Sequence, residues 1–541
     1  MGAEHIQPTV SSIEVGGVPA EGKDDALLRE LGYAPELRRN YSVIQVFGIA
    51  FSIMSLLPSI ASTLAFSLPA GPVGMTWGWI IPSCFILTIG LSMSEMGSAM
   101  PTSGGLYWWT FKFSPPSIRK PACFLAGYAN SLGLIGGLVS IDYGFSALLL
   151  SIPAIATEGA YSPTKYHTYG VFAACVISHA IAGALAANMV SRLQTVCIIT
   201  NIIIIVVTII ALPIGRANNG GVNSGKWVFT HMENLYTWPK GFTFMLAWLS
   251  PIWTIGAFDS CVHMAEEASN AAVAVPFGII GSISACGILG FVINSIIAAS
   301  MNPDVSATLG TYTGQPMAQI YYDCLGKHWT IGMMVCMFIV QWFMGFSIVV
   351  AGSRQVWAFS RDGALPFSSW LRVLNKKLQV PLRSLWFMCF IGLIIGLLSL
   401  IDSAATSALF SLAVASNTLA WILPIAMRVF FTVDTFTPGP FYMGKIGSKV
   451  VGSIATLYGT FVIVCLAMFP EEGPNPTKDT MNYTCVINGF VWFGALGYYF
   501  IHAHKWFTGP KHTFVDDAEV LEGVMEEEET SGNEAITKKE D

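Results

Sequence analysis

The strongest constraint on the fold of this chain is the repetition of apolar runs about as long as a lipid bilayer is thick. A helix needs roughly 20 consecutive apolar residues to cross the hydrocarbon core. Because lipid cannot hydrogen-bond to an open backbone, such runs are expected to be helices. The sequence predicts twelve spans, at 43–69, 75–97, 121–153, 167–188, 193–214, 241–265, 277–300, 329–356, 384–402, 406–428, 449–469 and 482–504.

Composition supports the same class. Of the 541 residues, 53% are hydrophobic and 11% are charged, whereas an average soluble domain is roughly 25% charged. This balance predicts a polytopic all-α membrane protein whose partners are the lipid bilayer and a small molecule. No basic patch suited to nucleic acid is present. We expect a cytosolic N-terminal tail (1–42), a twelve-helix domain (43–505) and an acidic cytosolic C-terminal tail (506–541) that includes Glu526–Glu529.

The distribution of basic residues predicts the orientation. Twelve spans place both termini on one side of the membrane, and that side holds 21 of the 27 Lys and Arg residues. Basic residues concentrate on the cytosolic side, so both termini are expected in the cytosol. The expected location is the plasma membrane, with the vacuolar membrane as the alternative. The sequence leaves open whether the sequon at Asn482, at the outer mouth of the last span, is glycosylated.

Two of the predicted spans are interrupted. The span 241–265 contains Pro251 and Gly256 and carries Asp259 within its apolar run, and the first span has Ser55 and Pro58 near its midpoint. A carboxylate in hydrocarbon is costly unless it faces a cavity or a partner. When corresponding segments of the two halves of a transporter are both broken, they indicate a binding site at the bilayer midplane.

Four motifs carry a resemblance to a known family. Glu95-Met-Gly-Ser-Ala-Met-Pro-Thr-Ser-Gly-Gly-Leu-Tyr, Ser360-Arg-Asp-Gly-Ala-Leu-Pro-Phe, Gly439-Pro-Phe-Tyr-Met-Gly and Phe258-Asp259 with His263-Met-Ala-Glu-Glu resemble motifs of the amino acid-polyamine-organocation superfamily. The last is similar to the amino acid/choline transporter branch, which includes fungal gamma-aminobutyrate, choline and polyamine permeases. The resemblance covers about residues 40–505. It implies a five-plus-five inverted-repeat fold, like that of the leucine transporter, in which broken spans one and six move against spans three, four, eight and nine.

The resemblance implies a permease for gamma-aminobutyrate or a related amino acid, with choline, a polyamine or another organic cation as the alternative. Family members typically bind the substrate carboxylate at a glycine-rich break in span one, and Ser52–Leu57 lacks those glycines. This departure favours omega-amino acids and amines over alpha-amino acids. Some relatives carry a lysine where this chain has Asn201, and an asparagine cannot titrate. A proton-coupling lysine is therefore absent.

Candidate site residues follow from the breaks and from the ionisable groups in apolar surroundings. Proton coupling is assigned to intramembrane acids and histidine, although Asp142 could instead lie wet at the outer end of its span, and His263 could cap a packed interface. The candidates for coupling are Asp142, Asp259, His263, Glu266 and Glu267. The candidates for substrate binding are Ser52, Ser55, Leu56, Tyr143, Asn201, Trp253, Thr254, Gly256, Phe258, Asp259 and Trp342.

Enzyme and metal functions find no support in the sequence. His263 has no second His or Cys at ligand spacing, and no Ser or Cys has a local base. We therefore expect no cofactor and no metal. Most of the eleven cysteines lie inside apolar segments and are interpreted as small core residues. A nutrient sensor that binds without transporting is a third possibility, but the short acidic tails do not suggest a structured signalling extension.

Overall fold

The computed structural model describes residues 23–185, 190–375, 377–378, 380–401, 403–432, 436–469, 473–477, 480–481 and 483–511. The sequon at Asn482 and the acidic run Glu526–Glu529 lie outside these residues. The chain divides into two compact units, one of residues 36–511 and one of residues 1–35 and 512–541. In the second unit, helix α1 (Lys23–Glu30) has two Asp residues in its first turn and Arg29 in its last, an arrangement that complements the helix dipole.

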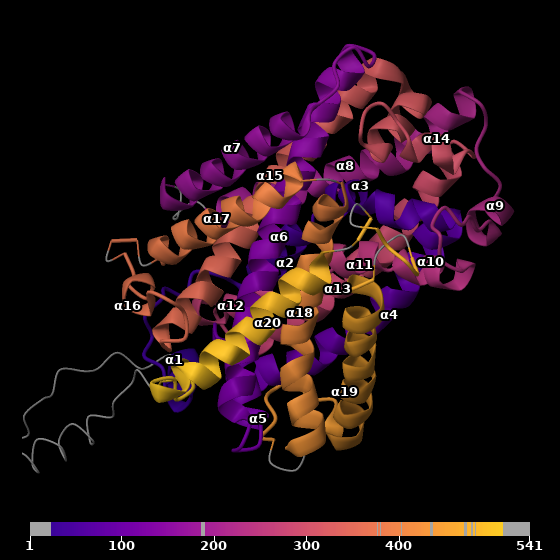
Figure 1. Ribbon diagram of the computed structural model, residues 1–541. Coiled ribbons are helices and arrows are strands. Elements are labelled where there is room, and N and C mark those ends of the chain that lie inside the picture. The colour runs from indigo at the N-terminus through magenta and orange to yellow at the C-terminus, as the bar shows by residue number, and fades with distance from the viewer. Residues whose placement is uncertain are drawn as a thin grey trace, which may run out of the picture. The chain divides into compact units, whose positions relative to one another are not determined.

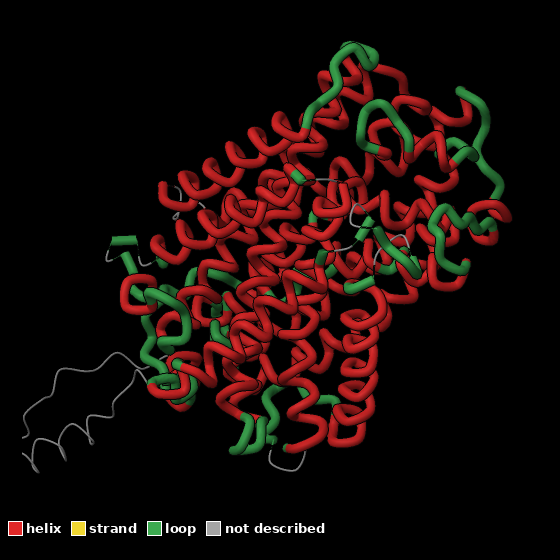
Figure 2. The backbone as a smooth tube through the Cα atoms, viewed as in Figure 1, coloured by secondary structure: helices red, strands yellow, loops and turns green. Residues whose placement is uncertain are grey.

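The unit 36–511 consists of helices joined by loops (Figure 1; Figure 2), and its described residues contain no β strand. Its α-helices are α2 (Val43–Met54), α3 (Leu56–Ser67), α4 (Gly71–Ala99), α5 (Gly105–Phe113), α6 (Arg119–Ala156), α7 (Lys165–Leu185), α8 (Val190–Asn218), α9 (Gly225–Thr230), α10 (Lys240–Leu246), α11 (Leu249–Thr254), α12 (Ser260–His263), α13 (Ala271–Ser300), α14 (Val305–Leu309), α15 (Pro316–Arg361), α16 (Ser368–Leu371), α17 (Leu382–Gly396), α18 (Ser403–Phe431), α19 (Gly444–Phe461) and α20 (Thr484–Ile501). Short 3-10 helices are Leu68–Ala70, Ala265–Glu267, Leu397–Leu400 and Ala503–Lys505, and Val462–Ala467 is a π-helix.

Ten helical stretches of the described residues are long and apolar enough to cross a membrane. The first, Val43–Ala99, is 57 residues long and contains two of the predicted spans. The predicted span 241–265 is not among the ten, because it is divided into short helices. The class of all-helical polytopic membrane protein is confirmed. The count of twelve spans and the inverted repeat stay predictions.

The long helices pack into two groups. In the first, α13 packs along α4 and α2, and α11 packs against α3 and α4. In the second, α6 packs against α7, α15 and α17, and α15 also contacts α7 and α17. Small residues allow close approach within each group: a Cβ on Gly90 would lie 2.3 Å from Ile283, and one on Gly127 would lie 2.2 Å from Phe359.

The first interruption separates α2 from α3 at Ser55, which has a left-handed backbone with φ of 31°. Pro58 has no N–H to donate to the carbonyl of Met54, and the Ser59 hydroxyl donates to that carbonyl instead, at 2.5 Å. The Ser55 hydroxyl donates to the Ser52 carbonyl at 2.6 Å. The serines at the midpoint thus satisfy carbonyls that the break releases, as an interrupted helix in lipid requires.

The second interruption lies between α11, which ends at Thr254, and α12, which begins at Ser260. Gly256 stands in this break, where an added Cβ would lie 2.8 Å from the carbonyl oxygen of Ile252. Pro251 is inside α11 rather than in the break. After the four residues of α12 the chain continues as a 3-10 turn and becomes extended at Ala268. The expected long helix beyond Gly256 therefore does not form.

Candidate functional site

A small cavity lies where the two interruptions meet the long helices. Its wall is mostly aliphatic, and it draws on five segments of the chain: α2, α6, α11 with the residues that follow it, α15 and α18. A small, largely apolar cavity with a few polar atoms is typical of a small-molecule site. The lining residues are Ile53, Leu134, Gly137, Ile141, Ile252, Trp253, Thr254, Gly256, Ala257, Met344, Ile348, Ala413, Val414 and Asn417.

Two polar atoms of the wall lack hydrogen-bond partners. The hydroxyl of Thr254 and Oδ1 of Asn417 are buried and accept or donate no hydrogen bond among the described residues. The indole N–H of Trp253 is satisfied, since it donates to the Ser140 hydroxyl at 2.9 Å. Leaving buried polar atoms unpaired costs about 1–3 kcal/mol each. A ligand in the cavity could recover this energy by bonding to Thr254 and Asn417.

The break in the first span lies beside the cavity, and the residues predicted there are brought together. Ser55 is buried, and its hydroxyl accepts a hydrogen bond from Nδ2 of Asn201 at 3.0 Å. Ser52 contacts α8 as well, because its hydroxyl donates to the Gln194 carbonyl at 3.5 Å. Leu56 is buried at the start of α3. Asn201 thus contacts the break directly, but Ile53 is the residue of this segment that lines the cavity.

Asp259 lies next to the cavity rather than in its wall. Its Oδ2 accepts hydrogen bonds from Nδ2 of Asn130 at 3.1 Å and from the indole of Trp421 at 3.0 Å, while Oδ1 has no partner among the described residues. Asn130 and Trp421 are each four positions along their helices from the cavity residues Leu134 and Asn417. Asp259 is therefore about one helical turn from the cavity.

Phe258 and His263 complete the surroundings of Asp259. The ring of Phe258 packs on Trp421 with centroids 4.5 Å apart, and Nε2 of His263 is 3.7 Å from Oδ2 of Asp259. Nδ1 of His263 lies 3.0 Å from the Ser103 carbonyl. Because a carbonyl only accepts, Nδ1 carries the hydrogen in this contact.

Glu266 and Glu267 are each bound to an arginine of α15. Arg361 donates to both carboxylate oxygens of Glu266, at 3.1 and 3.2 Å, and Arg354 donates to Glu267 at 2.7 Å. Glu266 also accepts the backbone N–H of Ser103 at 3.0 Å. The Ser103 peptide therefore links His263 to Glu266, and a continuous polar network runs from Asp259 to Arg361.

The chain before α2 closes over this charged network. Tyr41 N donates to the Glu267 carbonyl at 3.1 Å, and Ser269 N donates to the Tyr41 carbonyl at 2.8 Å. A guanidinium N–H of Arg39 donates to the Ala268 carbonyl, also at 2.8 Å. Burial raises the pKa of the Tyr41 phenol, and the negative charge of Glu267 adds to this shift. The Tyr41 phenol therefore stays neutral beside the two ion pairs.

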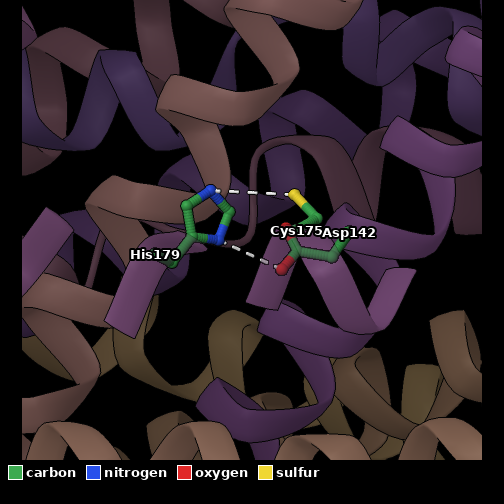
Figure 3. A group of neighbouring side chains, drawn as sticks. All are labelled: Asp142, Cys175 and His179. Carbon is green, nitrogen blue, oxygen red and sulfur yellow. Dashed lines mark hydrogen bonds and ion pairs between the residues drawn. The ribbon is translucent and has the colours of Figure 1, made fainter. Parts of the chain in front are cut away.

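Asp142 lies in a separate cluster between α6, α7 and α15, shown in Figure 3. Its Oδ2 is 3.1 Å from Nδ1 of His179, and both side chains are 0% exposed. Nε2 of His179 is 2.9 Å from the Trp342 carbonyl oxygen and 3.9 Å from Sγ of Cys175. Asp142 is buried, so its side chain is not solvent-exposed at the end of its span.

Two aromatic candidates do not reach the cavity wall. The indole of Trp342 donates to the Ser178 hydroxyl at 2.8 Å and stacks on Phe346, so this residue belongs to the Asp142–His179 cluster. The ring of Tyr143 is partly buried and meets Phe410 edge-on, with centroids 6.5 Å apart.

The sequence predictions missed His179, Asn417 and Arg354 as site residues. His179 could have been found, because it is an ionisable residue inside the apolar run 167–188 and so meets the same criterion as Asp142. Asn417 is a neutral polar residue in an apolar span, which is a weaker signal. Arg354 was counted only among the basic residues of the cytosolic side, whereas Arg361, with Asp362 and Gly363, was interpreted as a charged turn of an inner gate. Both arginines are buried.

Fold and cavity together define a class: a polytopic helical membrane protein with a small-molecule cavity at two helix breaks. The family model described as amino acid permease matches residues 41–491. The chain belongs to this amino acid permease family, as the sequence motifs implied, and it is a permease rather than an enzyme.

Three fungal relatives are similar along nearly their whole length. The chain is 45% identical to the GABA-specific permease of Saccharomyces cerevisiae, over 94% of this chain and 90% of that one. It is 35% identical to an uncharacterized amino-acid permease of Schizosaccharomyces pombe, over 95% and 93% of the two chains. Amino-acid permease 2 of Neurospora crassa is 31% identical over 93% and 90%.

Proposed function

We propose that this protein carries gamma-aminobutyrate, or a related amino acid whose amino and carboxylate groups are well separated, across a membrane by alternating access. The observation that supports this most directly is the cavity between the two helix breaks, whose wall is aliphatic except for a few polar atoms. The methylene chain of an omega-amino acid suits such a wall. The 45% identity to a relative named as GABA-specific favours the same substrate.

The helix ends beside the cavity offer opposite partial charges to the two ends of a zwitterion. No hydrogen bond among the described residues uses the carbonyls of Thr254 and Ile255, at the negative end of α11. These carbonyls and Oδ1 of Asn417 are suited to an ammonium group. The backbone N–H groups of Leu56 and Leu57, at the positive end of α3, are suited to a carboxylate. Discontinuous helices in transporters bind charged substrate groups in this way.

In this proposal the transporter has twelve spans in a five-plus-five fold, and both termini lie in the cytosol. The permease is located in the plasma membrane or the vacuolar membrane. The group of α2, α3, α4, α11 and α13 moves against the group of α6, α7, α15 and α17. The ion pairs Glu266–Arg361 and Glu267–Arg354 join the two groups at one end and hold that end closed. A proton is the coupling ion, and it cannot be carried at position 201, since Asn201 does not titrate.

Organic cations such as choline are the alternative substrates. A quaternary ammonium site uses several aromatic faces around the cation, yet among the described residues Trp253 is the one aromatic side chain in the cavity wall. Asp259, the carboxylate that would attract a cation, is outside the wall and already accepts two hydrogen bonds. Both observations favour a zwitterion.

A ligand panel tests the proposal. Thermal unfolding of the purified protein is measured with gamma-aminobutyrate, choline, putrescine and glutamate, and uptake of each labelled compound is measured in proteoliposomes. A ligand at a hundred times its dissociation constant stabilises a protein by about 2.7 kcal/mol. Stabilisation and uptake with gamma-aminobutyrate support the proposal. Response to choline alone favours the organic-cation alternative, and stabilisation without uptake favours a sensor.

Thr254→Val is expected to weaken gamma-aminobutyrate binding about tenfold. The substitution keeps the shape of the wall and removes the unpaired hydroxyl, and a hydrogen bond to a charged group contributes about 1.5–3 kcal/mol. Affinity is measured from the ligand dependence of thermal unfolding. The matched control is Thr418→Val, because the Thr418 hydroxyl is buried but bonds to the Val414 carbonyl of its own helix. Equal losses in the two variants would contradict the role of Thr254.

A further inference from the structure

The cluster of Asp142 and His179 is an ionisable site that the cavity does not explain. Both side chains are fully buried. They come from the neighbouring helices α6 and α7, which belong to the group of α6, α7, α15 and α17. A buried ionisable residue within a membrane span is costly and is therefore a candidate for a proton relay. The contacts of the two ring nitrogens show where the exchangeable proton is held.

The hydrogen bonds of His179 fix its ring. Nε2 is 2.9 Å from the Trp342 carbonyl oxygen, and a carbonyl can only accept, so Nε2 carries a hydrogen. A neutral imidazole has a hydrogen on one nitrogen only, which leaves a lone pair on Nδ1. Nδ1 is 3.1 Å from Oδ2 of Asp142. One proton must therefore lie between them, bound either to the ring or to the carboxyl group.

Loss of this proton would destabilise the cluster as it stands. The Nδ1 lone pair would then face a carboxylate at 3.1 Å with no exposure to water, and buried unpaired charge is strongly unfavourable. Oδ1 of Asp142 already has no partner among the described residues. It faces Gly345, where an added Cβ would lie 2.3 Å away. Release of the proton therefore requires α6, α7 and α15 to change their packing.

The cluster is next to the cavity. Ile141 and Met344 line the cavity, and they immediately precede Asp142 and Gly345 in the chain. Gln341, one turn before Gly345, donates to the Ile141 carbonyl at 2.9 Å and to the Ser62 hydroxyl of α3 at 3.5 Å. A movement of α3 or of the cavity wall is therefore transmitted to the backbone that carries Asp142.

The other titratable groups around Asp142 are thiols. Cys175 is on α7, and Cys389 on α17 is close enough to interact electrostatically with the Asp142 carboxylate. The faces of α3 and α15 near the pair present Ser62, Gln341, Trp342 and Phe346, none of which titrates in the neutral range. Asp142, Cys175 and His179 all carry atoms that metals bind. Asp142 faces Nδ1, while Cys175 faces Nε2 (Figure 3) and the Trp342 carbonyl lies 2.9 Å from the same nitrogen, so each ring nitrogen has its own hydrogen-bond partner.

We propose that the Asp142–His179 pair binds the proton that is transported with the substrate, one proton for each transport cycle. The inference rests on the proposed function, because it assigns the proton of that transport reaction. The pair takes up the proton when the cavity faces the acidic side and holds it between Nδ1 and Oδ2. It releases the proton when the packing of α6, α7 and α15 changes on the other side.

Asp142→Asn tests the assignment, because the amide can donate to Nδ1 and preserve the hydrogen bond without titrating. In proteoliposomes, an inward pH gradient is expected to accelerate gamma-aminobutyrate uptake by the wild type, and this acceleration should fall at least tenfold in the variant. Counterflow of gamma-aminobutyrate at equal pH needs no net proton movement and should stay within about threefold of wild type. His179→Gln replaces the ring with an amide that can still donate to the Trp342 carbonyl. This variant should also lose the pH-driven acceleration of uptake and keep counterflow.

Cys175→Ala is the control within the cluster. It should keep pH-driven uptake, and loss of that uptake would point to a metal or structural role instead. Driven uptake that persists in Asp142→Asn, or a parallel fall in uptake and counterflow, would overturn the assignment. Wild-type counterflow with no response to a pH gradient would overturn it as well and leave the proposed function intact.

Discussion

Glu95→Ala is expected to destabilise the protein by about 3–5 kcal/mol, the usual cost of leaving one partner of a buried ion pair uncompensated. Glu95 is 0% exposed near the end of α4 and accepts hydrogen bonds from Arg428 at 2.5 Å, from the backbone of Met443 at 2.6 Å and from Ser448 at 2.6 Å. The carboxylate thereby joins α4 to α18 and to the start of α19. Its removal leaves the guanidinium of Arg428, which is 7% exposed, without its carboxylate partner.

Denaturant unfolding of the purified protein in detergent measures the effect of Glu95→Ala. The matched control is Glu158→Ala, since Glu158 pairs with Lys327 at 2.9 Å but is 67% exposed. Exposed pairs contribute about 0–1 kcal/mol, so this variant should unfold nearly as the wild type does. Similar unfolding of Glu95→Ala and Glu158→Ala would show that the buried pair does not hold the three helices together.

Arg354→Glu is expected to reduce uptake by about a hundredfold or more, and the double variant Arg354→Glu with Glu267→Arg should recover a substantial part of it. Arg354 and Glu267 are 4% and 7% exposed, and a reversed charge places two carboxylates at a distance of a few ångströms. If the closed end loses 3–5 kcal/mol, the balance between the two transport conformations shifts by a factor of about 10² to 4 × 10³, since about 1.4 kcal/mol is a factor of ten. The transporter would then rest open at this end.

Uptake and counterflow of labelled gamma-aminobutyrate in proteoliposomes measure the effect of the Arg354 variants, with thermal unfolding as the check on folding. Arg372→Glu is the control, because Arg372 is an exposed arginine at the C-terminal end of α16 and lies outside both ion pairs. A swap that restores stability without restoring uptake would limit the pair to a structural role. Recovery of both would support a gate at this end.

Much of the fold follows from local properties of the sequence. Apolar runs of bilayer length predicted the helical membrane class, and the family motifs predicted the amino acid permease family. Both predictions are confirmed. The serines and Pro58 predicted the first interruption, and it occurs at Ser55. Gly256 predicted the second, although Pro251 is accommodated inside α11 and the expected helix beyond the break is four residues long.

The site was predicted less completely. Trp253, Thr254 and Gly256 line the cavity, and Ser55 bonds to Asn201. Glu266 and Glu267 were predicted as coupling candidates together with Asp259 and His263, but α12 ends at His263. The partners of the two glutamates are 95 and 87 residues away along the chain, a separation at which periodicity carries no information.

The sequence by itself determined the elements whose causes are local: helices long enough to cross a bilayer, the positions where proline, serine and glycine interrupt them, and the presence of acids in apolar surroundings. Tertiary structure alone decided which ionisable groups meet. Asp142 pairs with His179 of the next span, His179 bonds in turn to the Trp342 carbonyl of α15, and Glu267 pairs with Arg354. The physical reason is that such pairs depend on how helices rotate and pack against one another, which spacing along one helix does not specify.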